Sequence, residues 1–420
     1  MEKDHIAASP FSHPIYVMAK PVGSQCNLAC RYCYYLEKKG LYPQSTRMIM
    51  DEGLLERFIS QYIAAQTQRE VLFVWHGGEP LLLPLDFYRK VLVLQQKHAH
   101  GHVIDNSLQT NGTLLTDDWC KFLKDNHWLV GVSIDGPQVL HDAFRKNKSG
   151  RCSFADVVKG MDMLNRHGVE WNAMAVVNSL NAEHPKEFYH FFRDMGCRYI
   201  QFTPIVERVG TSSPLVNLSK DDKLDMTPET VSPRQWGNFL CSVFDEWVPN
   251  DVGEYFIQIF DATLANWLGV EPGVCSMARS CGNALAIEHN GDVYSCDHFV
   301  FPDYLLGNIR QKSLVSLVYG ERKNEYRKMK SSLPTQCRRC SFEFACHGEC
   351  PKNRLCHTVD GETGLNYLCS GYLQFFRHVA PYMDFMAEEW KADRAPANVM
   401  DAIRQGLFSR QGPVGGRGAH

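Results

Sequence analysis

Strand-like and helix-like apolar patterns alternate along the first half of the chain, and this alternation constrains the fold more than any other feature. Runs rich in β-branched and aromatic residues, typical of buried strands, are each followed by a stretch with helical spacing. Strands joined by helical crossovers pair in parallel with right-handed connections. The sequence therefore predicts an α/β fold, either an open doubly wound sheet or a partial barrel. The six expected strands are 14–22, 70–80, 102–112, 128–136, 169–178 and 199–207.

The loops after these strands are expected to lie at one edge of the sheet. The carboxyl ends of parallel strands meet there, and α/β proteins place their ligand sites at that edge. The loops at 26–33, 77–80, 110–112, 133–136 and 206–207 should therefore share one site.

The alternation stops near residue 208, and 420 residues are more than one compact core usually covers. A polar stretch to 233 indicates a connection, and residues 275–369 are rich in cysteine with little periodicity. An amphipathic stretch follows, which Pro381 should interrupt, and the last eleven residues are expected to be a disordered tail. The expected division is 1–207, a bridging region 208–272, a cysteine-rich domain 273–375, and a C-terminal helix with the tail at 376–420.

Composition excludes several classes of protein. The net charge of −3 argues against a nucleic-acid or anionic-membrane surface. The N-terminus lacks the apolar core of a signal peptide, and no apolar run approaches a membrane span. We therefore expect a cytoplasmic protein, by default a monomer. In a reducing compartment its sixteen cysteines are buried thiols, metal ligands or redox groups rather than disulfides.

Cys26, Cys30 and Cys33 have C-x3-C-x2-C spacing after the first expected strand. They are either core thiols, half of a zinc site, or ligands of an iron–sulfur cluster. Structural zinc sites pair two C-x2-C knuckles, whereas this triplet stands alone. Three thiolates on a four-iron cluster leave one iron open, and a cosubstrate with an amine and a carboxylate can occupy it.

This triplet, with an aromatic residue before its last cysteine, resembles the radical S-adenosylmethionine (SAM) superfamily, whose partial (β/α)6 barrel also matches the six units. The resemblance implies a [4Fe-4S] cluster and SAM as cofactors. It also implies roles for residues of the other strand-end loops. The methionine amine is met by Gly77, Gly78 and Glu79, the adenine by Tyr32 and Val206, and the ribose and methionine carboxylate by Ser133 and Arg145.

The later cysteines follow the pattern C-x5-C-x14-C, a gap, C-x2-C-x5-C-x3-C, and a last cysteine. This pattern resembles the twin-cluster SPASM extension of radical enzymes; a zinc segment is the alternative. The resemblance implies two further [4Fe-4S] clusters, three in all, suited to electron transfer. One would be held by Cys275, Cys281, Cys296 and Cys350, and the other by Cys337, Cys340, Cys346 and Cys369. The remaining thiols, of which Cys356 is the doubtful one, are Cys120, Cys152, Cys197, Cys241 and Cys356.

Asp297 directly follows Cys296 in "YSCDHF". It is either a turn carboxylate or a base that takes a proton as an electron leaves, with His298 as the alternative base. Together with "CRYCYYLEK" and "GECPKNR", this segment resembles the anaerobic sulfatase-maturating enzymes over residues 15–390.

That resemblance implies an oxygen-independent radical SAM dehydrogenase. It converts a Cys or Ser of a sulfatase motif to Cα-formylglycine by hydrogen abstraction at Cβ, with Asp297 as proton acceptor. The partners would be an unfolded or nascent sulfatase polypeptide and a reduced flavodoxin or ferredoxin. The sequence leaves open whether Cys or Ser is the target.

Three other functions are weighed against this one. A radical maturase that crosslinks a ribosomal peptide would share every cluster, but it usually carries a leader-peptide module, for which we expect no room before Ile15. A glycyl-radical activase would use ferredoxin-type inserts. A zinc-stabilised interaction protein would catalyse no reaction, and it would be colourless, whereas an iron–sulfur protein is brown.

Overall fold

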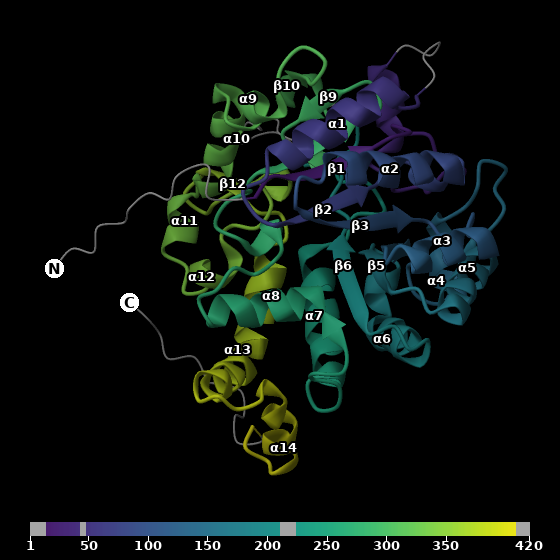
Figure 1. The fold of residues 1–420 in the computed structure, drawn as a ribbon. Helices are drawn as coiled ribbons and strands as arrows, with labels where there is room; N and C mark the ends of the chain where they lie inside the picture. The colour runs from purple at the N-terminus through teal and green to yellow at the C-terminus, as the bar shows by residue number, and fades with distance from the viewer. Residues whose placement is uncertain (1–13, 43–47, 211–223, 409–420) are drawn as a thin grey trace.

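The computed structural model describes residues 14–42, 48–210 and 224–408, and one ten-stranded sheet forms its centre (Figure 1). The strand order is β10-β9-β8-β1-β2-β3-β4-β5-β6-β7, and β1 to β7 are parallel. The six predicted strands and the α/β fold with a parallel sheet are confirmed. The strands are β1 (Tyr16–Lys20), β2 (Glu70–Trp75), β3 (Val103–Thr110), β4 (Leu129–Ser133), β5 (Trp171–Val177), β6 (Tyr199–Pro204), β7 (Phe256–Ile257), β8 (Ala284–Glu288), β9 (Asp292–Tyr294) and β10 (Leu305–Asn308).

Helices connect the parallel strands, as the alternation predicts. The crossover helices are α1 (Glu52–Ala64), α2 (Leu85–His98), α3 (Asp117–Asp125), α4 (Gln138–Phe144), α5 (Phe154–His167) and α6 (Pro185–Asp194). The rest are α7 (Pro233–Trp247), α8 (Gln258–Trp267), α9 (Leu314–Val318), α10 (Glu321–Ser331), α11 (Thr335–Arg338), α12 (Glu343–Cys346), α13 (Cys369–Lys391) and α14 (Val399–Arg404). A separate two-stranded sheet pairs β11 (Cys356–His357) with β12 (Thr363–Leu365).

Part of the core between the sheet and its helices is a cluster of aromatic side chains. Phe73 and Trp75 of β2 are fully buried, and Phe58 of α1 and Tyr88 of α2 meet them edge to face. The indole of Trp75 donates to the Asn106 amide oxygen at 2.9 Å, so its polar atom is satisfied inside the core. This packing fixes the carboxyl ends of the strands, where the candidate site lies.

The cysteine-rich segment is part of the same sheet, which the sequence did not predict. β8 runs parallel to β1, with Lys20 opposite Glu288, and β9 and β10 extend the sheet as antiparallel strands. The residues that follow β9, including Cys296 and Asp297, are thereby brought beside the end of β1.

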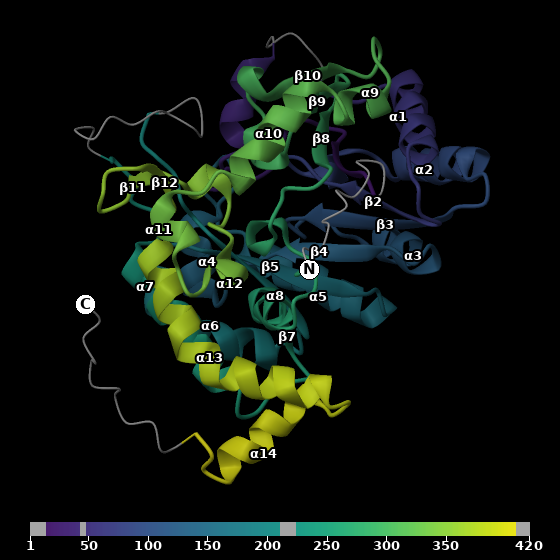
Figure 2. The same ribbon diagram turned by 90° about the vertical axis from the view of Figure 1, so that its left-hand side faces the viewer.

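The C-terminal helix corrects one prediction. Pro381 does not interrupt it, because α13 runs through that residue without a break. α13 packs along α7 and α8, so tertiary contacts stabilise the turn in which proline removes a hydrogen bond (Figure 2). The predicted disordered tail, residues 410–420, lies outside the described residues. None of the described helices is long and apolar enough to cross a membrane.

Candidate active site

The three-cysteine loop lies directly after β1 and is pinned by backbone hydrogen bonds. The amides of Ala29 and Arg31 donate to the carbonyls of Lys146 and Phe144, at 2.7 and 3.0 Å. Burial raises the pKa of the Cys26 thiol to about 11 and that of Cys30 to about 12. Thiolates therefore form here only if a cation replaces the lost hydration, as iron does when it binds cysteine. The donor set fits a cluster with three cysteine ligands.

The glycines of the second loop allow two backbones to approach closely. The amide of Gly78 donates to the carbonyl of Gly23 at 2.8 Å, and the amide of Glu79 donates to that of Gln25 at 2.8 Å. A Cβ atom on Gly78 would overlap the Gln25 carbonyl, and Gly77 has a φ of +124°. Only glycine fits at these positions. The segment therefore supports the chain just before Cys26.

Glu79 has its carboxylate inside the protein. It is fully buried and accepts hydrogen bonds from the amides of Leu81 (3.0 Å) and Asn111 (2.8 Å) and from the Thr110 hydroxyl (2.8 Å). Burial raises its pKa to about 7, although these three donors favour the charged form. Glu79 therefore ties the end of β2 to the end of β3 through its carboxylate, while its backbone amide holds the Gln25 carbonyl.

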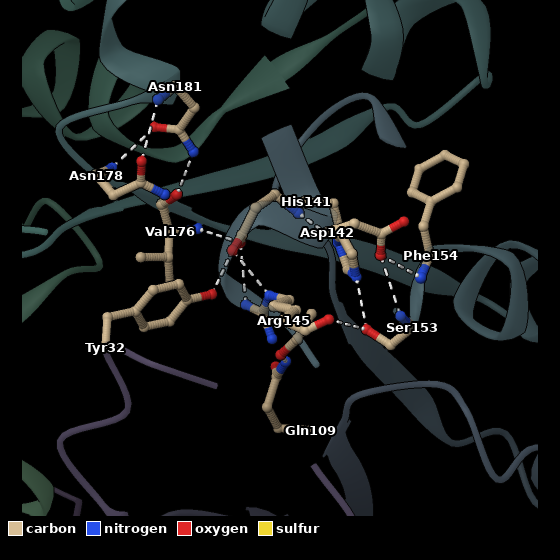
Figure 3. Close-up of polar contacts among 12 residues, drawn as sticks. Tyr32, Gln109, His141, Asp142, Arg145, Ser153, Phe154, Val176, Asn178 and Asn181 are labelled. Carbon is tan, nitrogen blue, oxygen red and sulfur yellow. Dashed lines mark hydrogen bonds and ion pairs between the residues drawn. The ribbon is translucent and has the colours of Figure 1, made fainter. Parts of the chain in front are cut away.

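Arg145 lies against a residue that the sequence analysis missed. Its guanidinium makes a bidentate pair with the buried carboxylate of Asp135, at 2.8 and 3.0 Å. Figure 3 shows Arg145 beside Tyr32. The Tyr32 hydroxyl and the Val176 amide donate to the same carboxylate. Burial opposes ionisation of Asp135, but Arg145 outweighs it and holds the pKa below its usual range. The signal available in the sequence was a carboxylate two residues after the end of β4.

The other predicted contacts of this edge are nearby. Ser133 ends β4, and its hydroxyl accepts a hydrogen bond from the Gln109 side chain at 3.0 Å. Val206 is buried, and its carbonyl accepts from the Lys352 ammonium at 2.7 Å. Lys352 also pairs with Glu207 at 2.6 Å. A residue of the cysteine-rich segment thus closes one side of the edge formed by β4 and β6.

Asp297 lies at the junction between the barrel and the cysteine-rich segment. Its carboxylate pairs with Lys20, the last residue of β1, and accepts a hydrogen bond from the Tyr34 hydroxyl. Burial alone would raise the pKa of Asp297, but the Lys20 ammonium holds it well below its usual range. Burial lowers the pKa of His298, which keeps that imidazole neutral. Asp297 is therefore the charged group here, and the sequence analysis missed Lys20 and Tyr34 as its partners.

A cavity of about 120 Å³ opens beside these groups, and Asp297, Ser133 and Arg145 are not among the residues that line it. It lies between the cysteine loop, the end of β6 and the cysteine-rich segment, and is large enough for part of a small ligand or side chain. The residues that the sequence predicted for the site and that line this cavity are Tyr32, Cys33, Val206 and His298.

The later cysteines form two neighbourhoods of adjacent thiols. Burial raises the pKa of the Cys350 thiol, and the charges of Glu349, Cys296 and Cys275 raise it further. Burial raises the pKa of the Cys369 thiol to about 11, with further contributions from the charges of three neighbouring cysteines, Cys337, Cys340 and Cys356.

Cys356 therefore lies near the second set without having been predicted in it. In the described ranges, no three His, Cys, Asp or Glu side chains are spaced to share a single metal ion. The two neighbourhoods are groups of adjacent thiols, and their donors are those that iron–sulfur clusters use.

Comparison with known proteins confirms both resemblances. The radical SAM superfamily profile matches residues 21–192, and the profile of the SPASM iron–sulfur cluster-binding domain matches 275–341. The chain is 59% identical over 402 residues to a serine-type anaerobic sulfatase-maturating enzyme of Bacteroides thetaiotaomicron, covering 95% of this chain and 97% of that protein. It is 30% identical to a cysteine-type enzyme of Clostridium perfringens, covering 90% and 100%.

A solved structure with the same fold extends the comparison. The structure named "Native anSMEcpe with bound AdoMet and Cp18Cys peptide" aligns with a TM-score of 0.78 at 30% identity, covering 90% of this chain and 99% of that one. That protein therefore holds a peptide and the SAM cosubstrate on a fold of this kind.

Proposed function

We propose how individual residues act in this chain, which belongs to the anaerobic sulfatase-maturating enzymes, radical SAM enzymes with a SPASM domain. The activity of this family is oxygen-independent conversion of a sulfatase Ser or Cys to Cα-formylglycine. The chain's fold, enzyme class and function are those that the sequence predicted.

Serine is the proposed target residue. The 59% identity to a serine-type enzyme, against 30% to a cysteine-type one, supports this choice. The substrate would be an unfolded or nascent sulfatase polypeptide in the cytoplasm, and a reduced flavodoxin or ferredoxin would supply the electron. The related structure with a bound Cp18Cys peptide supports an extended peptide ligand.

The proposed cofactors are SAM and three [4Fe-4S] clusters. The first cluster is assigned to Cys26, Cys30 and Cys33, and the other two to the cysteine sets predicted for them. When bound, these groups supply removal of the Cβ hydrogen atom and acceptance of one electron. The tight backbone contacts of Gly77 and Gly78 position the first loop for this chemistry.

The pair of Asp135 and Arg145 positions Tyr32. The Tyr32 hydroxyl donates to the Asp135 carboxylate, and the Arg145 guanidinium lies 5.6 Å from the Tyr32 ring centre. Arg145 already forms a bidentate pair with the Asp135 carboxylate. Its remaining N–H groups would donate to the methionine carboxylate. Tyr32 and Val206 would then border the adenine.

Asp297 takes the substrate proton in this proposal, and its contact with Lys20 and Tyr34 carries the assignment. A carboxylate with a lowered pKa is a weak base for an ordinary hydroxyl. The serine hydroxyl becomes acidic once its Cβ has lost a hydrogen atom, so Asp297 accepts the proton as the electron leaves. The C–O bond becomes C=O as the serine side chain loses one hydrogen atom from Cβ, one proton from its hydroxyl and one electron.

The test is anaerobic turnover of the reconstituted enzyme with SAM, a strong reductant and three matched peptides carrying S-x-P-x-R, C-x-P-x-R or A-x-P-x-R. Mass spectrometry follows the aldehyde and 5′-deoxyadenosine. The serine peptide should gain an aldehyde in step with 5′-deoxyadenosine, and the alanine peptide should not. Formation of 5′-deoxyadenosine with all three peptides unchanged would overturn the proposed substrate.

A further inference from the structure

Helix α10 buries two lysines that the proposed mechanism does not use. Lys323 and Lys330 both have 0% exposure. They are seven residues apart and therefore lie on the same face of the helix. Lysine is almost never fully buried in a folded protein unless a partner compensates its charge.

In the part of the chain that the structure describes, both ammonium groups donate to backbone carbonyls, and that of Lys323 also lies 4.8 Å from the centre of the Tyr326 ring. Lys323 donates to Ala284 and Ser295, at 2.6 and 2.7 Å. Lys330 donates to Ser276 and Glu349, both at 2.7 Å. Within the described residues, neither ammonium has a carboxylate oxygen inside 4.0 Å. Carbonyl dipoles satisfy the hydrogen bonds, but they do not neutralise the charge.

Three of the four carbonyls that accept these bonds belong to neighbours of predicted cluster ligands. Ser276 follows Cys275, Ser295 precedes Cys296, and Glu349 precedes Cys350. The two lysines therefore hold the backbone of three of the four cysteines in the first SPASM set. Burial lowers the pKa of Lys323 to about 8, while the charges of Cys296, Cys281 and Cys275 act in the opposite direction.

The Glu349 carboxylate partly compensates the charge of Lys330, whereas the charges that act in this direction on Lys323 are those of cysteines. The Glu349 carboxylate is engaged by the amides of Asn353 and Asn366, at 3.0 and 2.6 Å. Arg354 adds a further cation, and its guanidinium also donates only to backbone carbonyls, among them those of Gly348 and Lys330. The excess of buried positive charge matches an anionic group, and a cluster held by four thiolates is one.

We propose that Lys323 and Lys330 raise the reduction potential of the cluster assigned to Cys275, Cys281, Cys296 and Cys350, and thereby make it the acceptor of the electron removed from the substrate. The reduced cluster carries one more negative charge than the oxidised one, so fixed cations favour the reduced state. With the cluster bound, the substrate Cβ radical would give up one electron to it and its hydroxyl proton to Asp297, and the residue would become the aldehyde. The inference rests on the proposed function.

The experiment is a redox titration of the loaded full-length enzyme, followed by electron paramagnetic resonance. The variants are Lys323→Met, Lys330→Met and the double change, which keep side-chain length and remove charge. Lys328→Met is the matched control, because Lys328 is exposed on the same helix. Lys323→Arg and Lys330→Arg keep the charge. Iron content is measured for every variant.

One midpoint potential should become more negative in each Met variant and shift furthest in the double variant, while the control and the Arg variants keep the wild-type value. Unchanged potentials in all variants would overturn the inference. If a Met variant loads less iron, its remaining clusters still report the potential, because the titration detects only clusters that are present. Failure of the proposed function would appear separately, as a missing aldehyde with normal potentials and shifts.

Discussion

Replacing Asp297 by Asn tests the proposed proton transfer directly. The amide is close in shape to the carboxylate and can still accept a hydrogen bond from Tyr34. It cannot take the substrate proton, and it leaves the buried ammonium of Lys20 without its partner. The substitution therefore has a chemical effect and a structural effect, which must be separated.

The two effects differ in kind and in size. A positioned general base contributes roughly 10²–10⁴-fold to rate, which corresponds to about 3–5 kcal/mol of activation free energy. Stranding one member of a buried ion pair costs about 3–5 kcal/mol of folding stability. The double variant Lys20→Met/Asp297→Asn removes both charges. It should regain most of the stability lost in Asp297→Asn but not the lost aldehyde formation.

The assay compares formylglycine with 5′-deoxyadenosine from the same anaerobic reaction on the serine peptide. In Asp297→Asn and in the double variant, 5′-deoxyadenosine should still form while the ratio of aldehyde to 5′-deoxyadenosine falls by about a hundredfold or more. Denaturant midpoints of the loaded proteins report the structural effect. An undiminished ratio in either variant would refute the assignment of Asp297 as the base.

Three further substitutions test other parts of the site. Gly78→Ala should displace the Gln25 carbonyl, lower the iron bound by the three-cysteine loop and abolish 5′-deoxyadenosine formation; iron analysis checks this, with Gly40→Ala as control because Gly40 has open space around its Cα. Asp135→Asn should weaken the compensation of the buried Arg145 and cost up to about 3–5 kcal/mol, seen as a lower denaturant midpoint, and normal stability would contradict the paired arrangement. Cys356→Ser should keep the full iron content and aldehyde yield, and loss of iron would make Cys356 a ligand.

The parallel sheet could be predicted because most of its strands are short apolar runs that alternate with stretches of helical spacing. A run such as that of β2 reads as a strand with no help from the rest of the chain, since nearly every residue in it is apolar. The pairing of β8 with β1 could not be predicted, because it joins residues more than 260 positions apart and neither strand encodes its partner. The break at Pro381 was predicted from the low helix propensity of proline. In the structure, α13 continues through Pro381 because its contacts with α7 stabilise the helix.

The sequence identifies the candidate cysteine ligands of the site, but it does not identify every residue that pairs with the other site residues. Cysteine spacing identifies Cys26, Cys30 and Cys33 because the chemistry requires several thiols close together. Asp135 and Arg145 lie on either side of α4, and no spacing rule connects them. Lys20 stood within an apolar strand, where a single cation gives no sign of the carboxylate that it meets.

The proposed proton acceptor and a ligand of the proposed electron acceptor are consecutive residues, Asp297 and Cys296. Each has its own buried lysine: Lys20 pairs with the Asp297 carboxylate, and Lys323 donates to the carbonyl just before Cys296. A proton and an electron that leave the substrate would therefore arrive at adjacent positions. Their combined transfer moves no net charge through the buried junction, whereas a lone charge there would carry a large desolvation cost. The Lys20 ammonium keeps the Asp297 carboxylate ionised, and the Lys323 ammonium favours the reduced state of the cluster. Because both lysines are in place before the reaction, oxidation of the substrate needs little reorganisation around the two acceptors.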